Sequence, residues 1–116
     1  MLRYYYDKNP LTEESRILVE NMKADILLLA SVNDDCWPAE VSAKHVEEIL
    51  KKSNYPYRVK TVIYEKGSHA IGSMLRNEKV RKKLTSMLPA EKKYPKECEE
   101  ARIDSVKQIE SFLKDW

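Results

Sequence analysis

The sequence predicts an α/β fold in which two parallel strands are joined by a helix. Residues 25–31, Asp-Ile-Leu-Leu-Leu-Ala-Ser, form a short apolar run between polar residues, which is typical of a strand buried on both faces of a parallel sheet. Residues 57–64 are rich in β-branched and aromatic side chains, which favours a second strand. A helical pattern separates the two runs. A connection of that length implies parallel strands with a right-handed crossover.

Residues 1–24 are expected to form an entry segment that precedes the first strand. Asn9-Pro10 is a turn signal, and Thr12 is a candidate N-cap for a short helix. The apolar stripe of that helix would consist of Ile17, Leu18 and Met22.

The helix between the strands is expected to begin near Ala39, after Pro38, and to run to about Ser53. Asn54 and Pro56 should stop it. Its apolar stripe would consist of Ala43, Val46, Ile49 and Leu50. Residues 25–72 therefore hold both strands and the loops that follow them.

The last third of the chain predicts one clear helix, over residues 99–116. Its apolar side would consist of Ile103, Val106, Ile109, Phe112, Leu113 and Trp116. Before it, residues 74–88 suggest a short helix or an irregular excursion, and Pro89 to Pro95 suggest a polar loop. The 116 residues are enough for a single domain. A two-stranded parallel sheet leaves edges unpaired, so further structure is expected to complete it.

Charge and composition exclude several classes of protein. The 21 basic and 19 acidic residues give a formal charge of +2, so nothing points to nucleic acid or a membrane surface as a partner. The longest apolar run, Ile26 to Ala30, is too short for a membrane span. The N-terminus has no signal-peptide pattern, so a cytoplasmic protein is expected. The two cysteines form neither a disulfide framework nor a CxxC zinc pair, so no metal or cofactor is expected.

The chemistry-bearing residues lie in the loops that follow the two predicted strands. The first loop contains Asp34 and Asp35, and the second contains His69. Because the carboxyl ends of parallel strands meet at one edge of the sheet, an acid and a histidine can meet there. A hydrolytic triad uses such a carboxylate to orient an imidazole, which then moves protons. The other histidine, His45, falls within the predicted helix and is expected on its solvated face.

At these residues the chain resembles a known family. Residues 23–38, Lys-Ala-Asp-Ile-Leu-Leu-Leu-Ala-Ser-Val-Asn-Asp-Asp-Cys-Trp-Pro, resemble the acid-bearing strand and loop of the bile-acid-CoA:amino acid N-acyltransferase and acyl-CoA thioesterase family. Residues 62–71, Val-Ile-Tyr-Glu-Lys-Gly-Ser-His-Ala-Ile, are similar to its Gly-x-His loop. The resemblance implies the C-terminal strand–helix–strand–helix part of an α/β-hydrolase fold. It also implies that the complete enzyme acts on an acyl-CoA thioester.

The resemblance carries two site residues onto this chain. Asp34 takes the position of the catalytic acid and His69 that of the base. Asp34 is preferred over Asp35 because it lies three residues after the family's usual glycine position, where this chain has Ser31. The order acid then histidine also fits α/β-hydrolases.

The family's nucleophile has no counterpart in this sequence. Its elbow has the form Gly-x-Ser-x-Gly, and the only glycines are Gly67 and Gly72. The chain is therefore expected to be a truncated, excised or degenerate relative, in which acyl transfer lacks its first step. The alternative is a catalytically inactive interaction module. Its exposed sheet edge would pair with a second copy, as a homodimer, or with a missing N-terminal segment.

Each candidate residue also has a structural interpretation. Asp34 and Asp35 could be turn residues after a strand, and His69 could be a loop histidine without a task. Cys36 could form a Cys–His dyad with His69, but it lies on the acid loop and no helix N-terminus lowers its pKa there. The charge run over residues 76–83 could face the phosphates of a CoA moiety, although a solvated helix face is the preferred interpretation.

Overall fold

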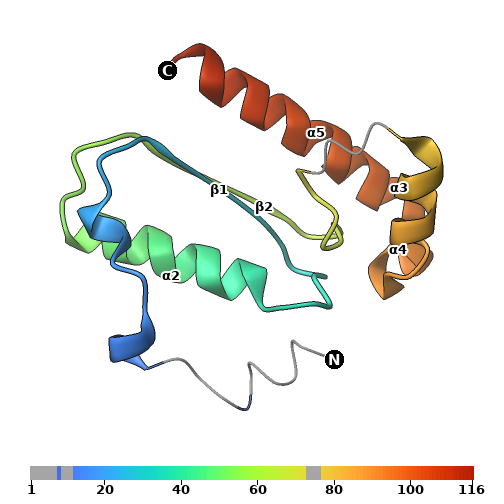
Figure 1. Cartoon of the computed structure of the whole chain (residues 1–116), viewed down its shortest axis with the longest axis horizontal. Coiled ribbons are helices and arrows are strands. Elements are labelled where there is room, and N and C mark those ends of the chain that lie inside the picture. The colour runs from blue at the N-terminus through green and yellow to red at the C-terminus, as the bar shows by residue number, and fades with distance from the viewer. Residues whose placement is uncertain (1–7, 9–11, 73–76) are drawn as a thin grey trace.

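The computed structural model describes residue 8, residues 12–72 and residues 77–116. The Asn9-Pro10 turn and Arg76, the first residue of the charge run, lie outside the described residues. Figure 1 shows a thin central sheet with one helix below it and the C-terminal helix above it in that view.

The sheet consists of two parallel strands, β1 (Ile26–Ser31) and β2 (Val59–Tyr64). They pair in register from Ile26 opposite Val59 to Ser31 opposite Tyr64. The backbone N–H of Val32 continues this ladder and donates to Tyr64 O at 2.9 Å. The predicted α/β class and the parallel pairing are confirmed. Both strands end at the same level, which brings the loops that follow them together.

Helix α2 (Ala39–Lys52) connects the strands and covers one face of the sheet. Its Ala39 and Ala43 pack on Ala30 of β1 to form the buried core, with Leu28 and Ile63 beside them. The small alanine side chains allow helix and sheet to approach closely. The helix ends before Asn54, which has φ of 50°, a left-handed conformation that asparagine tolerates well.

Helix α5 (Pro95–Lys114) lies on the other face. There, Leu27 and Leu29 of β1 line a cavity of about 480 Å³ together with Ile109 and Phe112 of α5. Helices α3 (Glu78–Thr85) and α4 (Pro89–Lys93) precede α5. Asn77 caps α3, because its side chain accepts hydrogen bonds from the first-turn N–H groups of Lys79 and Val80.

The C-terminal region differs from its prediction in two respects. The segment expected to be a polar loop from Pro89 to Pro95 forms helix α4 through Lys93, and α5 begins at Pro95 instead of Glu99. Both prolines occupy the first turn of a helix, where a missing N–H costs nothing.

The buried side of α5 is also rotated from the predicted apolar stripe. Ile103, Leu113 and Trp116 are 49%, 52% and 78% exposed. The buried residues are Cys98, Ala101, Arg102, Ser105 and Phe112. The physical reason is that several of these side chains bond to neighbouring loops, so the helix is oriented by polar contacts as well as by its apolar residues.

The entry segment forms two short 3₁₀ turns, over Glu13–Ser15 and Val19–Asn21. The predicted apolar stripe is wrong, because Ile17, Leu18 and Met22 are 81%, 51% and 47% exposed. Thr12 makes no side-chain capping bond to the backbone. Instead, Arg16 between the turns adopts an extended conformation and forms ion pairs with Glu13 and Glu20, at 2.8 and 2.7 Å.

Strand β1 is less buried than predicted. Ala30 and Ser31 at its carboxyl end are each 1% exposed, while the side chains from Ile26 to Leu29 are only partly buried. Within the described residues the sheet has no third strand. The apolar side chains of β1 are therefore less buried than the sequence predicts. Among these residues, no helix has the length and apolar character needed to cross a membrane.

Candidate functional site

The first site residue, Asp34, lies in the turn that follows β1 and is 4% exposed. Its Oδ1 accepts hydrogen bonds from the backbone N–H groups of Cys36 at 2.8 Å and Trp37 at 3.2 Å. Aspartate side chains commonly bond to the backbone two residues on in this way. These bonds compensate for the loss of water around a buried carboxylate, and they leave Oδ2 to face the second loop.

The second site residue, His69, follows β2 and brings its imidazole to that oxygen. Nδ1 of His69 lies 2.9 Å from Oδ2 of Asp34. An ionised carboxylate can only accept, so the ring donates from Nδ1 in this contact. When the imidazole is neutral, Nε2 is then the acceptor. The His69 side chain is 50% exposed. An imidazole held at one nitrogen and open to solvent is therefore available for proton transfer.

The loops that carry the two residues are tied to each other directly. The hydroxyl of Ser31, at the end of β1, donates a hydrogen bond to Gly67 O. The side-chain amide of Asn33 donates to Glu65 O at 2.5 Å. Ser31 stands where the resemblance implies a glycine, and its hydroxyl joins the acid loop to the histidine loop.

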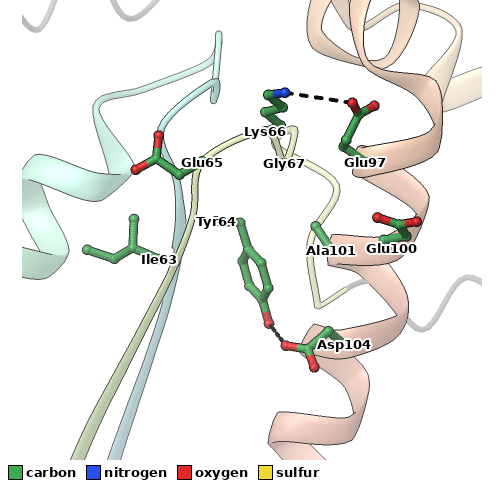
Figure 2. A pocket seen from close by; sticks show the side chains of 9 residues that line it. All are labelled: Ile63, Tyr64, Glu65, Lys66, Gly67, Glu97, Glu100, Ala101 and Asp104. Atoms are coloured by element: carbon green, nitrogen blue, oxygen red, sulfur yellow. Dashed lines mark hydrogen bonds and ion pairs between the residues drawn. The ribbon is translucent and has the colours of Figure 1, made fainter.

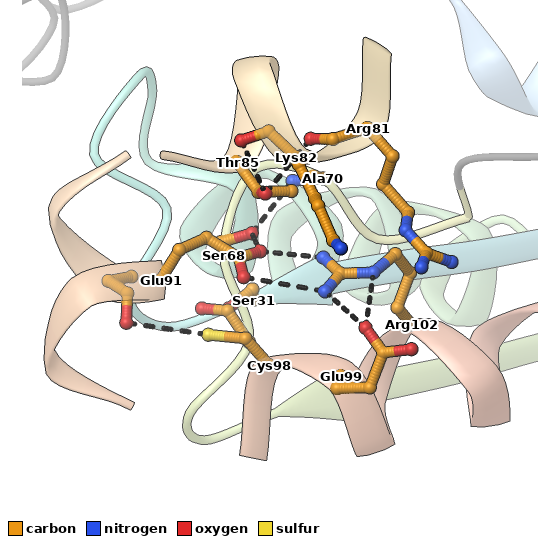
Figure 3. A network of polar contacts seen from close by, with 12 residues as sticks. Ser31, Ser68, Ala70, Arg81, Lys82, Thr85, Glu91, Cys98, Glu99 and Arg102 are labelled. Carbon is orange, nitrogen blue, oxygen red and sulfur yellow. Dashed lines mark hydrogen bonds and ion pairs between the residues drawn. The ribbon is translucent and has the colours of Figure 1, made fainter. Parts of the chain in front are cut away.

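A buried polar network fixes the residue before His69 (Figure 3). Ser68, 1% exposed, donates to Glu91 Oε1 at 2.5 Å and accepts from Ala70 N–H at 3.0 Å. Glu91 of α4 is paired with Arg102 of α5, whose Nη1 lies 2.6 Å from the same carboxylate. The histidine loop is thus anchored to both α4 and α5.

Two further contacts join the histidine loop to α5. The thiol of Cys98 donates to Lys66 O at 3.2 Å, and the N–H of Gly72 donates to Ser105 Oγ at 2.7 Å. Gly72 has φ of 65°, a conformation that favours glycine. Sequence reasoning missed these anchors. The available signal was a group of small and polar residues on one side of α5. A search for periodic apolar residues does not detect such a group.

The second aspartate of the acid loop has a different partner. Oδ2 of Asp35 accepts a hydrogen bond at 3.3 Å from the N–H of Ala90, in the first turn of α4. The structure therefore brings Asp34 to His69 and directs Asp35 to α4. His45 lies exposed on α2, as expected.

Cys36 is partly buried, and its environment disfavours the thiolate. Burial, followed by the negative charges of Asp34 and Asp35, raises the pKa of the Cys36 thiol above its ordinary value. A nucleophilic cysteine needs the opposite shift, so the local electrostatics oppose the Cys–His dyad.

A separate cavity of about 360 Å³ lies between the end of β2 and α5 (Figure 2), and neither Asp34 nor His69 lines it. The Tyr64 hydroxyl donates across it to Asp104 at 2.7 Å. Burial, this hydrogen bond and the nearby carboxylate raise the pKa of Tyr64 above its ordinary value. Most of the charged residues that line it are acidic, namely Glu65, Glu97, Glu100 and Asp104. Such a lining does not suit an anionic thioester.

Comparison with known families finds one family model that matches this chain. The family model described as BAAT / Acyl-CoA thioester hydrolase C terminal matches residues 2–93. No curated protein and no solved structure matches the chain. The family match includes both strands, α2 and both site loops, and it covers well over half of the sequence. The chain therefore belongs to the BAAT / acyl-CoA thioester hydrolase C-terminal family.

Proposed function

We propose that this chain supplies the acid and the base for acyl-CoA thioester chemistry, with Asp34 as the acid and His69 as the base. The observation that carries the proposal is the 2.9 Å contact between Nδ1 of His69 and Oδ2 of a nearly buried Asp34. The family to which the chain belongs acts on such thioesters. Asp34 would hold the proton on Nδ1 and stabilise the imidazolium once it forms.

In the proposed reaction a serine or cysteine from outside this chain attacks the acyl carbonyl. His69 takes the proton of that nucleophile at Nε2 and returns it to the departing CoA thiolate as the thioester C–S bond breaks. It then removes a proton from water or an amine as that molecule attacks the acyl-enzyme, and it gives this proton to the serine or cysteine as the acyl–enzyme bond breaks. This chain performs the proton transfers and does not form the covalent bond.

A chimeric enzyme tests the proposal. The matching C-terminal part of a complete thioesterase of this family is replaced by residues 1–116, and release of free thiol from acyl-CoA esters is followed. We expect turnover in the chimera and a loss of about 10³-fold or more with His69→Ala, as for removal of a triad member. His45→Ala is the matched control, because that histidine is exposed on α2, and it should leave the rate unchanged.

Two outcomes would contradict the proposal. One is a chimera that keeps its rate when His69 becomes alanine. The other is a chimera that folds like the parent enzyme, by circular dichroism, and yet releases no thiol. Asp34→Asn separates orientation from proton transfer. It should lower kcat strongly with little change in KM, because the imidazole stays in place in the wrong tautomer.

A second candidate function is self-association, which the open sheet favours. Within the described residues β1 pairs only with β2. Leu27 and Leu29 line a mainly apolar cavity on the α5 face of the sheet, together with Asp25 and the exposed Leu113 and Trp116. We infer that a second copy of the chain pairs with the unpaired edge of β1 and also covers this cavity, because unpaired strand edges promote such pairing. In the chimera the N-terminal part of the enzyme would cover it instead.

Sedimentation equilibrium tests this second candidate. The wild-type chain should dimerise, and Leu27→Lys should shift it to monomer by replacing an apolar side chain of this cavity with a charged one. Val80→Lys on α3, where Val80 is 44% exposed, is the control and should still dimerise. A wild-type chain that is folded and monomeric at all concentrations would rule out the dimer.

A further inference from the structure

The acid loop and the histidine loop together bring a third functional side chain into the site. Among the residues that the structure describes, Asp34, Cys36 and His69 form the group whose carboxylate oxygen, thiol sulfur and imidazole nitrogen all lie within 4.8 Å of one another. We propose that these three side chains bind a divalent cation of the zinc class. Binding itself does not depend on the catalytic proposal made above.

The donor set selects the class of ion. It contains one hard oxygen, one imidazole nitrogen and one soft sulfur. Thiolate and imidazole ligands suit zinc and its neighbours, whereas magnesium and calcium prefer sites made of oxygen alone. An ionised carboxylate, a thiolate and a neutral imidazole also balance the two positive charges of the ion.

The geometry is close to what such an ion needs. Zinc binds these ligands at roughly 2.0–2.3 Å, so the ligand atoms of a tetrahedral site lie about 3.3–3.8 Å apart. The separations that involve the sulfur are at most 4.8 Å and would shorten by up to about 1 Å, while the 2.9 Å contact between His69 Nδ1 and Asp34 Oδ2 would lengthen slightly. Cys36 is only partly buried and His69 is 50% exposed, so both have room to rotate. Asp34 is fixed by two backbone N–H groups and would serve as the anchor.

The electrostatics of the acid loop favour a cation. The carboxylate of Asp34 lies among the three donor atoms, and Asp35 stands between Asp34 and Cys36 in the chain, so the loop holds two negative charges beside the proposed site. The same negative charges attract a dication, and the bound ion then favours the thiolate. Binding would therefore release the thiol proton. Three protein ligands leave the fourth coordination position of a tetrahedral ion open, so that water or a small ligand can bind there.

Occupation of this site would also control the proposed reaction, and this step alone rests on the catalytic proposal. The ion would take the Asp34 oxygen and the His69 nitrogen that otherwise bond to each other. An imidazole bound in this way cannot act with Asp34 as a general base. Zinc is therefore expected to inhibit the chimeric enzyme, and a chelator should restore its rate.

Titration with Co²⁺ tests binding without any assay of activity, because a cobalt–thiolate bond gives a charge-transfer absorption in the near ultraviolet. We expect one equivalent of Co²⁺ to produce this band and Zn²⁺, but not Mg²⁺, to remove it. Cys36→Ser should abolish the band. His69→Ala should weaken Co²⁺ binding by more than about tenfold, since even losses outside the ligand shell cost ten- to a hundredfold.

The second histidine provides the matched control. His45→Ala changes an exposed histidine on α2 that takes no part in the contacts described for the site loops. This variant should keep the band and the affinity. Three results would overturn the proposed site. The wild-type chain could lack the band, or the band could survive Cys36→Ser. All variants could also bind Co²⁺ equally, which would indicate an adventitious ion only. Circular dichroism of each variant verifies that the fold is retained.

Discussion

Gly67 lies at a point where the two site loops leave no room for a side chain. A Cβ atom at this position would come within 2.9 Å of Ser31 Oγ and within 3.2 Å of side-chain atoms of Ile71 and Tyr64. The same residue accepts the Ser31 hydrogen bond through its carbonyl. The approach of the acid loop to the histidine loop therefore depends on a glycine here.

We expect Gly67→Ala to lower the free energy of unfolding by about 1–3 kcal/mol, the usual cost of overpacking. Ser31→Gly in the same chain removes the nearest of the three contacts and should recover part of the loss. Urea denaturation of the two single variants and the double variant measures the coupling. Strictly additive effects would show that Ser31 and Gly67 do not share this contact.

The two cysteines should differ sharply in their reactivity with a thiol reagent. Cys98 is 1% exposed, and burial, assisted by the charge of Glu91, raises the pKa of its thiol to about 11. Cys36 is only partly buried. In the native chain we expect Cys36 to be modified first and Cys98 to react only after unfolding. Mass spectrometry with Cys36→Ser and Cys98→Ser identifies each thiol, and rapid native labelling of Cys98 would contradict its placement.

At the residue scale the sequence predicted the right aspartate for the contact with His69, although only the family resemblance separated Asp34 from Asp35. Both are turn residues after a strand, and nothing local distinguishes them. In the structure, Asp35 accepts a bond from Ala90 in the first turn of α4. Because that segment was interpreted as a loop, this partner was not foreseen. The catalytic roles of Asp34 and His69 remain predictions.

At the scale of elements, the ion pair between α4 and α5 is the buried contact that holds the histidine loop. Glu91 and Arg102 have side chains that are 8% and 9% exposed, and Ser68 donates to the same carboxylate. A buried charge that loses its partner is costly. This pair therefore fixes the position of the loop more than an exposed pair would.

We expect Glu91→Gln to lower the free energy of unfolding by about 1–3 kcal/mol, because it removes the buried carboxylate that pairs with Arg102 and accepts from Ser68, while Arg102 keeps its second pair with Glu99. The matched control is Glu78→Gln, which removes an exposed pair with Lys82 whose side chains are 64% and 73% exposed. That substitution should change the free energy of unfolding by no more than about 0.5 kcal/mol. Urea denaturation of both variants measures the two free energies of unfolding. Equal losses in the two variants would contradict a structural role for the buried pair.

The elements that the sequence predicted well are those with a simple local pattern. The apolar run of β1, the β-branched residues of β2 and the apolar spacing of α2 each indicate one structure, and the observed bounds agree closely. The region after residue 88 lacks such a pattern. There the prolines at 89 and 95 were interpreted as loop residues, whereas each occupies the first turn of a helix.

At the scale of the whole molecule, topology explains why the candidate site could be located from sequence. Two parallel strands in register end together, so the loops after β1 and β2 must be neighbours. The network that holds those loops could not be predicted in the same way. Ser68, Glu91, Arg102 and Ser105 come from separate segments, and buried polar contacts leave no periodic signal in a sequence.

Asp34 is proposed to hold His69 as a base with its proton on Nδ1. Nitrogen-15 NMR of the two imidazoles tests this on the chain itself, in the presence of a chelator and at a pH where both are neutral. We expect His69 to be protonated at Nδ1, with Nε2 able to accept, and we expect Asp34→Asn to change this state while His45 stays as it was. If His69 resembles the exposed His45 in its tautomer and does not respond to Asp34→Asn, the proposed acid–base pair is wrong.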